Sequence, residues 1–219
     1  MTYALIEKAA RAKHLEILGG FHPAPDDEHL SGFGTLLMFG PREPGFWEAF
    51  TAQSEYLDGT PNPVDRWSSR VITSLAVAFN AHPLFPYGGP PYQPFYQWAL
   101  RTGRCHPSPI SLLAHDTAGL FVSFRGALAF QQTLDLPAPL PNPCTTCTAQ
   151  PCRTSCPVDA FSGGAYDVDA CRAYLTQNRQ GSCMSQGCAA RRACPVSQGY
   201  GRVEAQSALH MQAFLTNGP

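Results

Sequence analysis

Apolar residues recur at helical spacing in several stretches of the first 139 residues. The clearest stretch covers residues 63–79, where Pro63 suits a first helical turn and six apolar residues lie on one face: Val64, Trp67, Val71, Ile72, Leu75 and Ala78. A weaker pattern of alternating charged and apolar residues predicts an amphipathic helix over residues 3–17. Shorter helices are expected over residues 44–56 and 92–101.

Short apolar runs in the same part of the chain predict strands. Residues 35–39 read TLLMF and are closed by Gly40 and Pro41, which is typical of a buried strand. Residues 111–114 and 119–124 are expected to pair as a hairpin across the polar residues between them. Helices and strands in mixed order favour a mixed α/β domain.

The last part of the chain has little apolar material. Helices are expected over residues 168–178 and roughly 202–214. The segment LPAPLPNPC, residues 136–144, contains four prolines, which exclude both a regular helix and a central strand. We therefore place a domain boundary there, between residues 1–139 and 140–219. A region as small and polar as the second needs a metal or a cluster to hold it together.

Cysteine carries the strongest chemical signal. Eight of the nine cysteines lie between Cys144 and Cys194, in two arrays that each end in Cys-Pro-Val. The first array is Cys144, Cys147, Cys152 and Cys156, and the second is Cys171, Cys183, Cys188 and Cys194. Eight thiols in two sets of four are the ligands that two [4Fe–4S] clusters require.

The spacing also predicts how the thiols are shared. In two-cluster ferredoxins, the cysteine that precedes proline binds the cluster of the other array. This rule assigns one cluster to Cys144, Cys147, Cys152 and Cys194. It assigns the other cluster to Cys156, Cys171, Cys183 and Cys188.

Zinc, disulfides and plain buried thiols are the alternatives to iron–sulfur clusters. Zinc favours paired Cys-x2-Cys knuckles, and Cys144 with Cys147 is the single pair with that spacing. Cys105 lies outside both arrays and is interpreted as a packed small residue rather than a nucleophile.

Charge and hydropathy limit the partners. The formal net charge is −1, so the composition does not indicate a positively charged surface for nucleic acid. Residues 140–219 carry six arginines against four acidic residues, an excess that suits anionic clusters. The first twenty residues contain no export signal and no apolar run is long enough to span a bilayer, so we expect a cytoplasmic protein with reduced thiols.

The stretch from Leu112 to Cys194 resembles the strand-to-ferredoxin part of epoxyqueuosine reductase and its iron–sulfur relatives. The matching segments are GLFVSFRGAL, LDLPAPLPNPC, the first array with CPVDAF, DACRAYLTQ around Cys171, and the closing Cys-Pro. The resemblance implies two [4Fe–4S] clusters in a C-terminal ferredoxin-like domain. It also implies an N-terminal α/β domain that binds cobalamin and receives electrons from the clusters.

These observations predict an α+β protein with a mixed α/β domain followed by a mainly helical, ferredoxin-like domain with two clusters. The expected function is one-electron transfer to a site in, or docked on, residues 1–139. The acceptor is a partner protein or a small-molecule substrate, and no catalytic residue is assigned. The aromatic, proline-rich segment 82–98 is either a pocket wall for a flavin or corrin ring or a plug for the domain's own core. A cobalamin- or flavin-dependent reductase and a zinc-stabilised binding module remain as alternatives.

Overall fold

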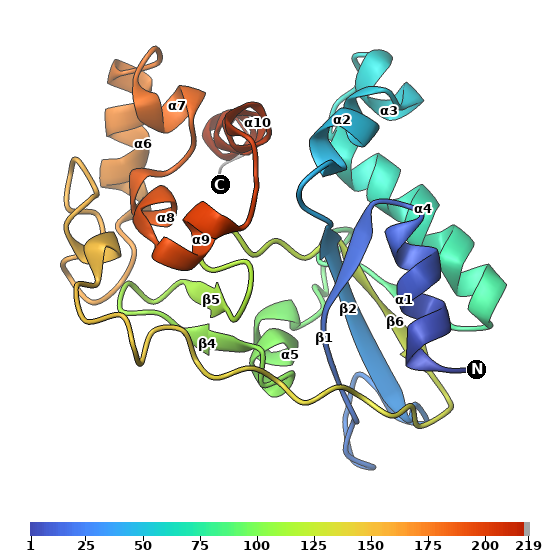
Figure 1. Ribbon diagram of the computed structural model, residues 1–219. Coiled ribbons are helices and arrows are strands. Elements are labelled where there is room, and N and C mark those ends of the chain that lie inside the picture. The colour runs from blue at the N-terminus through green and yellow to red at the C-terminus, as the bar shows by residue number, and fades with distance from the viewer. Residues whose placement is uncertain (217–219) are drawn as a thin grey trace. The chain divides into compact units, whose positions relative to one another are not determined.

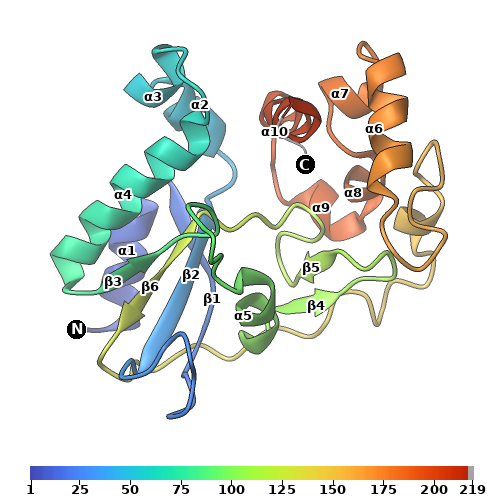
Figure 2. The same ribbon diagram turned by 180° about the vertical axis from the view of Figure 1, so that it is seen from behind.

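The computed structural model describes residues 1–216, and its chain divides into two compact units (Figures 1 and 2). The first unit comprises Met1–Arg104 and Ser123–Leu140. The second comprises Cys105–Val122 and the described residues from Pro141 onward. Helices make up 38% of the structure and strands 13%, which confirms the expected mixture of helix and strand.

The division between the units differs from the two segments expected from the sequence. The chain passes from the first unit to the second after Leu140, one residue from the predicted boundary between residues 139 and 140. The chain also passes between the units after Arg104 and after Val122. The segment Cys105–Val122 is therefore part of the second unit, together with the cysteine-rich region. Composition does not mark this segment, because its apolar residues resemble those of the first unit.

A four-stranded antiparallel sheet forms the centre of the first unit, in the order β1-β2-β6-β3. The strands are β1 (Leu15–Phe21), β2 (Thr35–Pro41), β3 (His82–Leu84) and β6 (Gly126–Phe130). Every residue of β2 and β6 is buried, as expected for strands with both faces covered. The strand expected over residues 35–39 is therefore confirmed.

Helices α1 (Tyr3–Arg11) and α4 (Pro63–Phe79) contact each other and pack on the sheet. The predicted range of α4 is confirmed, and its apolar stripe is buried from Val64 to Leu75. The predicted helix over residues 3–17 is too long. His14 has a positive φ of 56°, and Leu15 begins β1, where Leu15, Glu16 and Ile17 follow the two-residue period of a strand.

Two predicted helices are also shorter than the sequence indicated. Residues 44–56 form two short helices, α2 (Phe46–Thr51) and α3 (Ser54–Leu57), instead of one. Helix α5 (Phe95–Arg101) begins three residues later than predicted. Among residues 1–216, no helix has both the length and the apolar character needed to cross a membrane.

The aromatic segment 82–98 packs into the first unit. Phe95 and Trp98 are buried, and Phe85 stacks on Tyr87 with 5.5 Å between ring centroids. The Tyr87 hydroxyl donates a hydrogen bond to the carbonyl oxygen of Asp65 at 2.9 Å. Phe95 and Trp98 therefore belong to the core, whereas Tyr92 and Tyr96 are exposed.

The second unit contains two short strands and a series of short helices. Strand β4 (Cys105–Pro107) pairs with β5 (Leu113–His115). The hairpin predicted between residues 111–114 and 119–124 is wrong, because β4 takes the place beside β5. The isolated bridge of Gly119 is to His115, one residue beyond the first predicted strand. The helices are η1 (Pro151–Arg153), α6 (Val168–Gln177), α7 (Ser182–Ser185), α8 (Ala189–Ala193), α9 (Pro195–Gly199) and α10 (Glu204–Thr216).

The Glu55 and Arg70 pair gives the first unit a pH-dependent contribution to stability. Arg70 donates two hydrogen bonds to the buried Glu55 carboxylate, one of them at 3.0 Å from Nη2 to Oε2. The hydrogen bonds from Arg70 lower the pKa of Glu55 from 4.5 to about 2. Because the folded pKa lies below the unfolded one, the contribution is present above pH 4.5 and is lost as the pH falls through 2.

We predict that Glu55→Gln lowers the free energy of unfolding by roughly 1 kcal/mol at pH 7, a modest value because the Arg70 side chain is 52% exposed. Urea titrations of both proteins at several pH values measure the difference. It should shrink as the pH falls from 4.5 towards 2. A difference that is independent of pH would contradict the assignment.

Two cysteine-lined cavities as candidate metal centres

Four cysteines line a cavity of about 220 Å³ in the second unit: Cys144, Cys147, Cys152 and Cys194. Cys152 lies in η1 and is buried, and Cys194 is the residue from which α9 begins. Leu120 and Ser108 contribute to the wall from the segment that precedes the first array in the chain. This first cavity therefore gathers residues that are up to 88 positions apart, from Ser108 to Val196.

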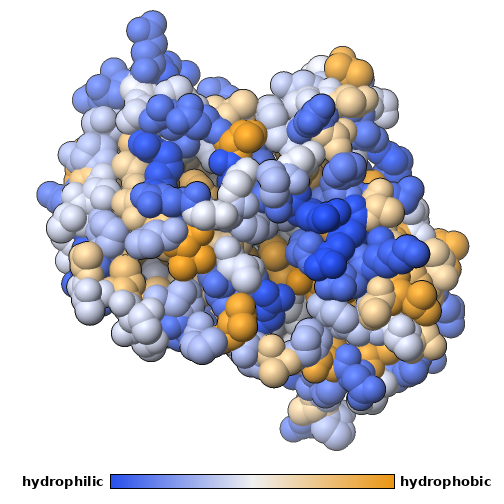
Figure 3. Space-filling view, in the orientation of Figure 1, coloured by the Kyte–Doolittle hydropathy of each residue, from blue (hydrophilic) through white to orange (hydrophobic). Residues whose placement is uncertain are grey.

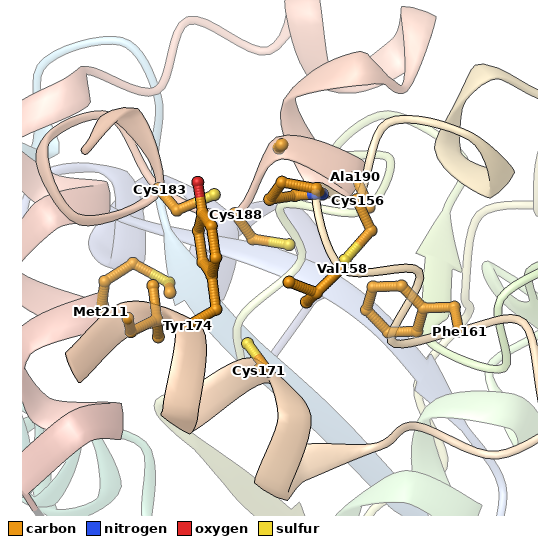
Figure 4. A pocket seen from close by; sticks show the side chains of 12 residues that line it. Cys156, Val158, Phe161, Cys171, Tyr174, Cys183, Cys188, Ala190 and Met211 are labelled. Atoms are coloured by element: carbon orange, nitrogen blue, oxygen red, sulfur yellow. The ribbon is translucent and has the colours of Figure 1, made fainter. Parts of the chain in front are cut away.

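The other four cysteines line a second, tighter cavity (Figure 4): Cys156, Cys171, Cys183 and Cys188. Cys171 comes from α6, Cys183 from α7, and Cys188 is the residue from which α8 begins. Their sulfur atoms face a common space bordered by the side chains of Val158, Phe161 and Met211. The volume of this second cavity is about 20 Å³.

The local sequence explains how these cysteines are held. Asp167 caps α6 by accepting a hydrogen bond from the Ala170 backbone N–H at 2.9 Å, which places Cys171 in the first turns of the helix. Pro195 occupies the first turn of α9 and leaves Cys194 extended, with φ −64° and ψ 122°. Cys194 therefore precedes the first turn of α9, and it lines the first cavity together with cysteines of the first array.

Each cavity combines three cysteines of one array with the Cys-Pro cysteine of the other. The structure brings together the two sets of four expected from the sequence. None of the nine cysteines forms a disulfide. Cys105, which lies in β4 and is 1% exposed, is not among the residues that line either cavity. Whether the eight thiols bind metal stays a prediction.

Burial and mutual repulsion disfavour thiolates in both cavities. Burial raises the pKa of Cys144 and of Cys152, and the neighbouring Cys194 raises both further. Burial also raises the pKa of Cys171 and of Cys183, with Cys188 acting in the same direction. Four deprotonated thiols in such a place need a compensating positive charge, which a metal centre supplies.

Backbone N–H groups donate hydrogen bonds to two sulfur atoms of the second cavity, and the charge of an arginine acts on one of them. The Ala160 backbone N–H donates to Cys156 Sγ at 3.4 Å. The Ala189 backbone N–H donates to Cys183, and the Arg192 guanidinium also lowers the pKa of this thiol. Such donors and charges stabilise a thiolate and adjust the reduction potential of a cluster that it binds.

The arrangement differs from that of a single-ion site. Within residues 1–216, no group of three or more His, Cys, Asp or Glu side chains is placed to hold one metal ion. A tetrahedral zinc site needs its four donors about 2 Å from one point. A [4Fe–4S] cluster instead takes one thiolate at each of its four irons, so its ligands surround a larger body.

Both sets have the donor type and number that a [4Fe–4S] cluster needs, but the cavities differ in room. The first is about 220 Å³, whereas the second, at about 20 Å³, holds roughly one water molecule. The thiols of the second set must therefore move apart to admit a cluster.

Other polar side chains of the two units lie in ordinary structural contacts. His115 is fully buried, and its Nδ1 accepts hydrogen bonds from the backbone N–H groups of Thr117 and Ala118, each at 3.1 Å. Arg125 donates to Asp65 at 3.1 Å in the first unit. Arg191 donates to the Leu120 carbonyl oxygen at 3.2 Å, which ties α8 to the segment that lines the first cavity.

Sequence reasoning missed the contribution of residues 105–122 to the first cavity. Ser108, Pro109 and Leu120 line it although they precede the first array by more than twenty residues. Their residue types carry no ligand signal, and the only sequence cue was the nearby glycine, Gly119. A Cβ atom at Gly119 would come within 2.6 Å of the Ser197 nitrogen and 3.0 Å of Cys194 Sγ.

The assignment of the two cavities rests on the residues that line them and on the spacing of those residues in the chain. No protein family, curated protein or solved structure matches this chain.

Proposed function

We propose that the second unit binds two [4Fe–4S] clusters and that the protein relays single electrons. One cluster is held by Cys144, Cys147, Cys152 and Cys194, and the other by Cys156, Cys171, Cys183 and Cys188. The observation that carries the proposal is the gathering of eight thiols, from two arrays, into two separate sets of four. When bound, each cluster supplies reversible uptake of one electron.

The roles of the protein's own residues follow from their positions. The cysteine thiolates hold the iron, and the backbone N–H groups of Ala160 and Ala189 stabilise negative charge on two of the sulfurs. Arg192 places a positive charge near the second set. The crossed use of the two Cys-Pro cysteines supports a ferredoxin-like arrangement for this unit.

The electron acceptor is proposed to be a partner protein or a small-molecule substrate, in or docked on residues 1–139. The resemblance to epoxyqueuosine reductase makes a cobalamin- or flavin-dependent reductase the alternative. A binding module stabilised by zinc is the alternative without redox chemistry. A single purification distinguishes these three functions, because each of them predicts a different set of bound cofactors.

Protein purified without oxygen should be brown, contain about eight iron and eight sulfide per chain, and bleach with dithionite. Iron, zinc and acid-labile sulfide analysis together with an absorption spectrum make the measurement. Cys105→Ala is the matched control, since Cys105 does not line either cavity, and it should keep all the iron. Zinc without sulfide would refute the proposal, and a copurifying corrinoid or flavin would favour the reductase.

The crossed assignment makes its own prediction for paired substitutions. Cys156 and Cys171 belong to different arrays but line the same cavity. The double variant Cys156→Ala, Cys171→Ala should therefore lose about half of the iron, the same fraction as Cys171→Ala alone. Iron analysis after anaerobic purification measures the loss. Removal of nearly all the iron would show that each array binds its own cluster.

Gly119 offers a test that leaves every cysteine in place. Gly119 has a φ of 56°, and a methyl group there would press on Ser197 and Cys194. We predict that Gly119→Ala reduces the iron content by about half, through loss of the first set's cluster. Gly163→Ala is the matched control, because a Cβ atom there meets nothing within 4 Å. Equal iron content in the two variants would contradict the prediction.

A further inference from the structure

Helix α10 places apolar side chains against the second cavity. Met211 lines this cavity together with its four cysteines (Figure 4). Phe214 and Leu215 follow Met211 on the helix, and all three pack against the apolar cluster that contains Leu175 and Cys183. Figures 1 and 2 both show α10 beside α7, the helix that carries Cys183. Because α10 contains no cysteine, it forms a wall of the cavity without supplying a ligand.

An aromatic stack fixes α10 to the part of the chain that carries Cys171. The Tyr166 ring stacks on Phe161, with 4.8 Å between ring centroids, and on Phe214, with 6.3 Å. Phe161 itself lines the cavity. Burial raises the pKa of Tyr166, and a hydrogen bond to Cys171 adds to the rise. The guanidinium carbon of Arg172 lies 5.1 Å from the centroid of the Phe214 ring, and its Nη2 donates to the Phe214 carbonyl oxygen at 3.3 Å.

The walls of the second cavity are unfavourable to water. Apart from the cysteines and Tyr174, the lining consists of proline, aliphatic residues, Phe161 and Met211. A buried water molecule needs roughly two to four polar partners, and apolar side chains supply none. An apolar shell of this kind controls how closely solvent approaches a metal centre and, through the local dielectric, its reduction potential.

The exposed face of the molecule in Figure 3 mixes hydrophilic and hydrophobic residues. It therefore does not point to a docking surface for a redox partner. The contact of α10 with the second cavity is the more specific observation.

We infer that α10 is a cover that keeps water away from the cluster bound by the second set, with Met211 as its contact residue. The inference rests on the proposed function, because it requires that cluster. Met211 is itself partly exposed, so shortening its side chain opens the cavity to solvent instead of leaving a sealed void. Water stabilises the reduced cluster more than the oxidised cluster, because the reduced cluster carries one more negative charge. Opening the cover therefore raises the reduction potential.

The test is pulsed electron paramagnetic resonance of the whole protein, reduced with dithionite in D₂O, which detects deuterium near each reduced cluster. Met211→Ala should increase the deuterium signal of the second set's cluster about twofold and raise its reduction potential. The first set's cluster should change in neither respect. Cys171→Ala, which should lack the second set's cluster, identifies the signal that belongs to the second cavity.

Three further variants of the same helix separate the cover from its surroundings. Met211→Leu keeps an apolar side chain of similar volume and should behave as the unmodified protein. Gln212→Ala shortens a neighbouring side chain that is exposed and lines neither cavity, so neither cluster should change. Phe214→Ala removes the ring that contacts Tyr166 and Arg172, and it should also increase the deuterium signal of the second set's cluster.

The outcomes distinguish this inference from the proposed function. An unchanged deuterium signal in Met211→Ala and Phe214→Ala, with both clusters present, would overturn the inference and leave the proposed function intact. Loss of the second set's cluster in both variants would assign α10 a role in packing and also overturn it. Absence of clusters from the unmodified protein would overturn both.

Discussion

Most of the second unit depends on one constraint: two segments of chain must exchange a cysteine. Cys156 ends the first array but lines the cavity of the second, and Cys194 does the reverse. This exchange requires the two arrays to lie side by side, since neither cavity is complete without a thiol from the other. Helix starts at Cys188 and Cys194 set the direction of those two thiols. Short helices and turns suit this task better than a long helix, because each thiol must approach from a different direction.

The same thiols are part of the apolar core of the second unit. Cys152 packs in one cluster of buried side chains with Ile110, Ala114, Leu120 and Ala190, and Cys183 packs in another with Leu175 and Met184. Both apolar clusters are small, and burial raises the pKa of their cysteines. Metal binding to these thiols would therefore contribute to folding as well as to the proposed electron transfer, because the cysteines also occupy core positions. The first unit, with its sheet and the packed faces of α1 and α4, has a core without such ligands.

Local sequence patterns predicted what local forces determine. Residues 63–79 form the predicted helix because a proline at the start and an apolar stripe act together, and residues 35–39 form a buried strand because nearly every residue is apolar. The prediction of a helix over residues 3–17 was wrong at its end, because the spacing of buried residues changes to that of a strand at Leu15. The prediction of a hairpin over residues 111–124 was wrong because β5 pairs with β4. The two sets of cysteines were predictable because thiols at ligand spacing carry a chemical signal. Ser108 was not, because a lone serine carries none and only tertiary structure brings it to the cavity.

The central claim is that the two arrays exchange their Cys-Pro cysteines around two clusters. Anomalous diffraction at the iron absorption edge, from crystals grown without oxygen, locates the iron relative to each sulfur. The account predicts two separate iron peaks, with Cys194 Sγ at the peak shared by Cys144 and Cys156 Sγ at the peak shared by Cys171. Iron peaks that place Cys156 with Cys144, or a signal at the zinc edge without iron, would contradict it.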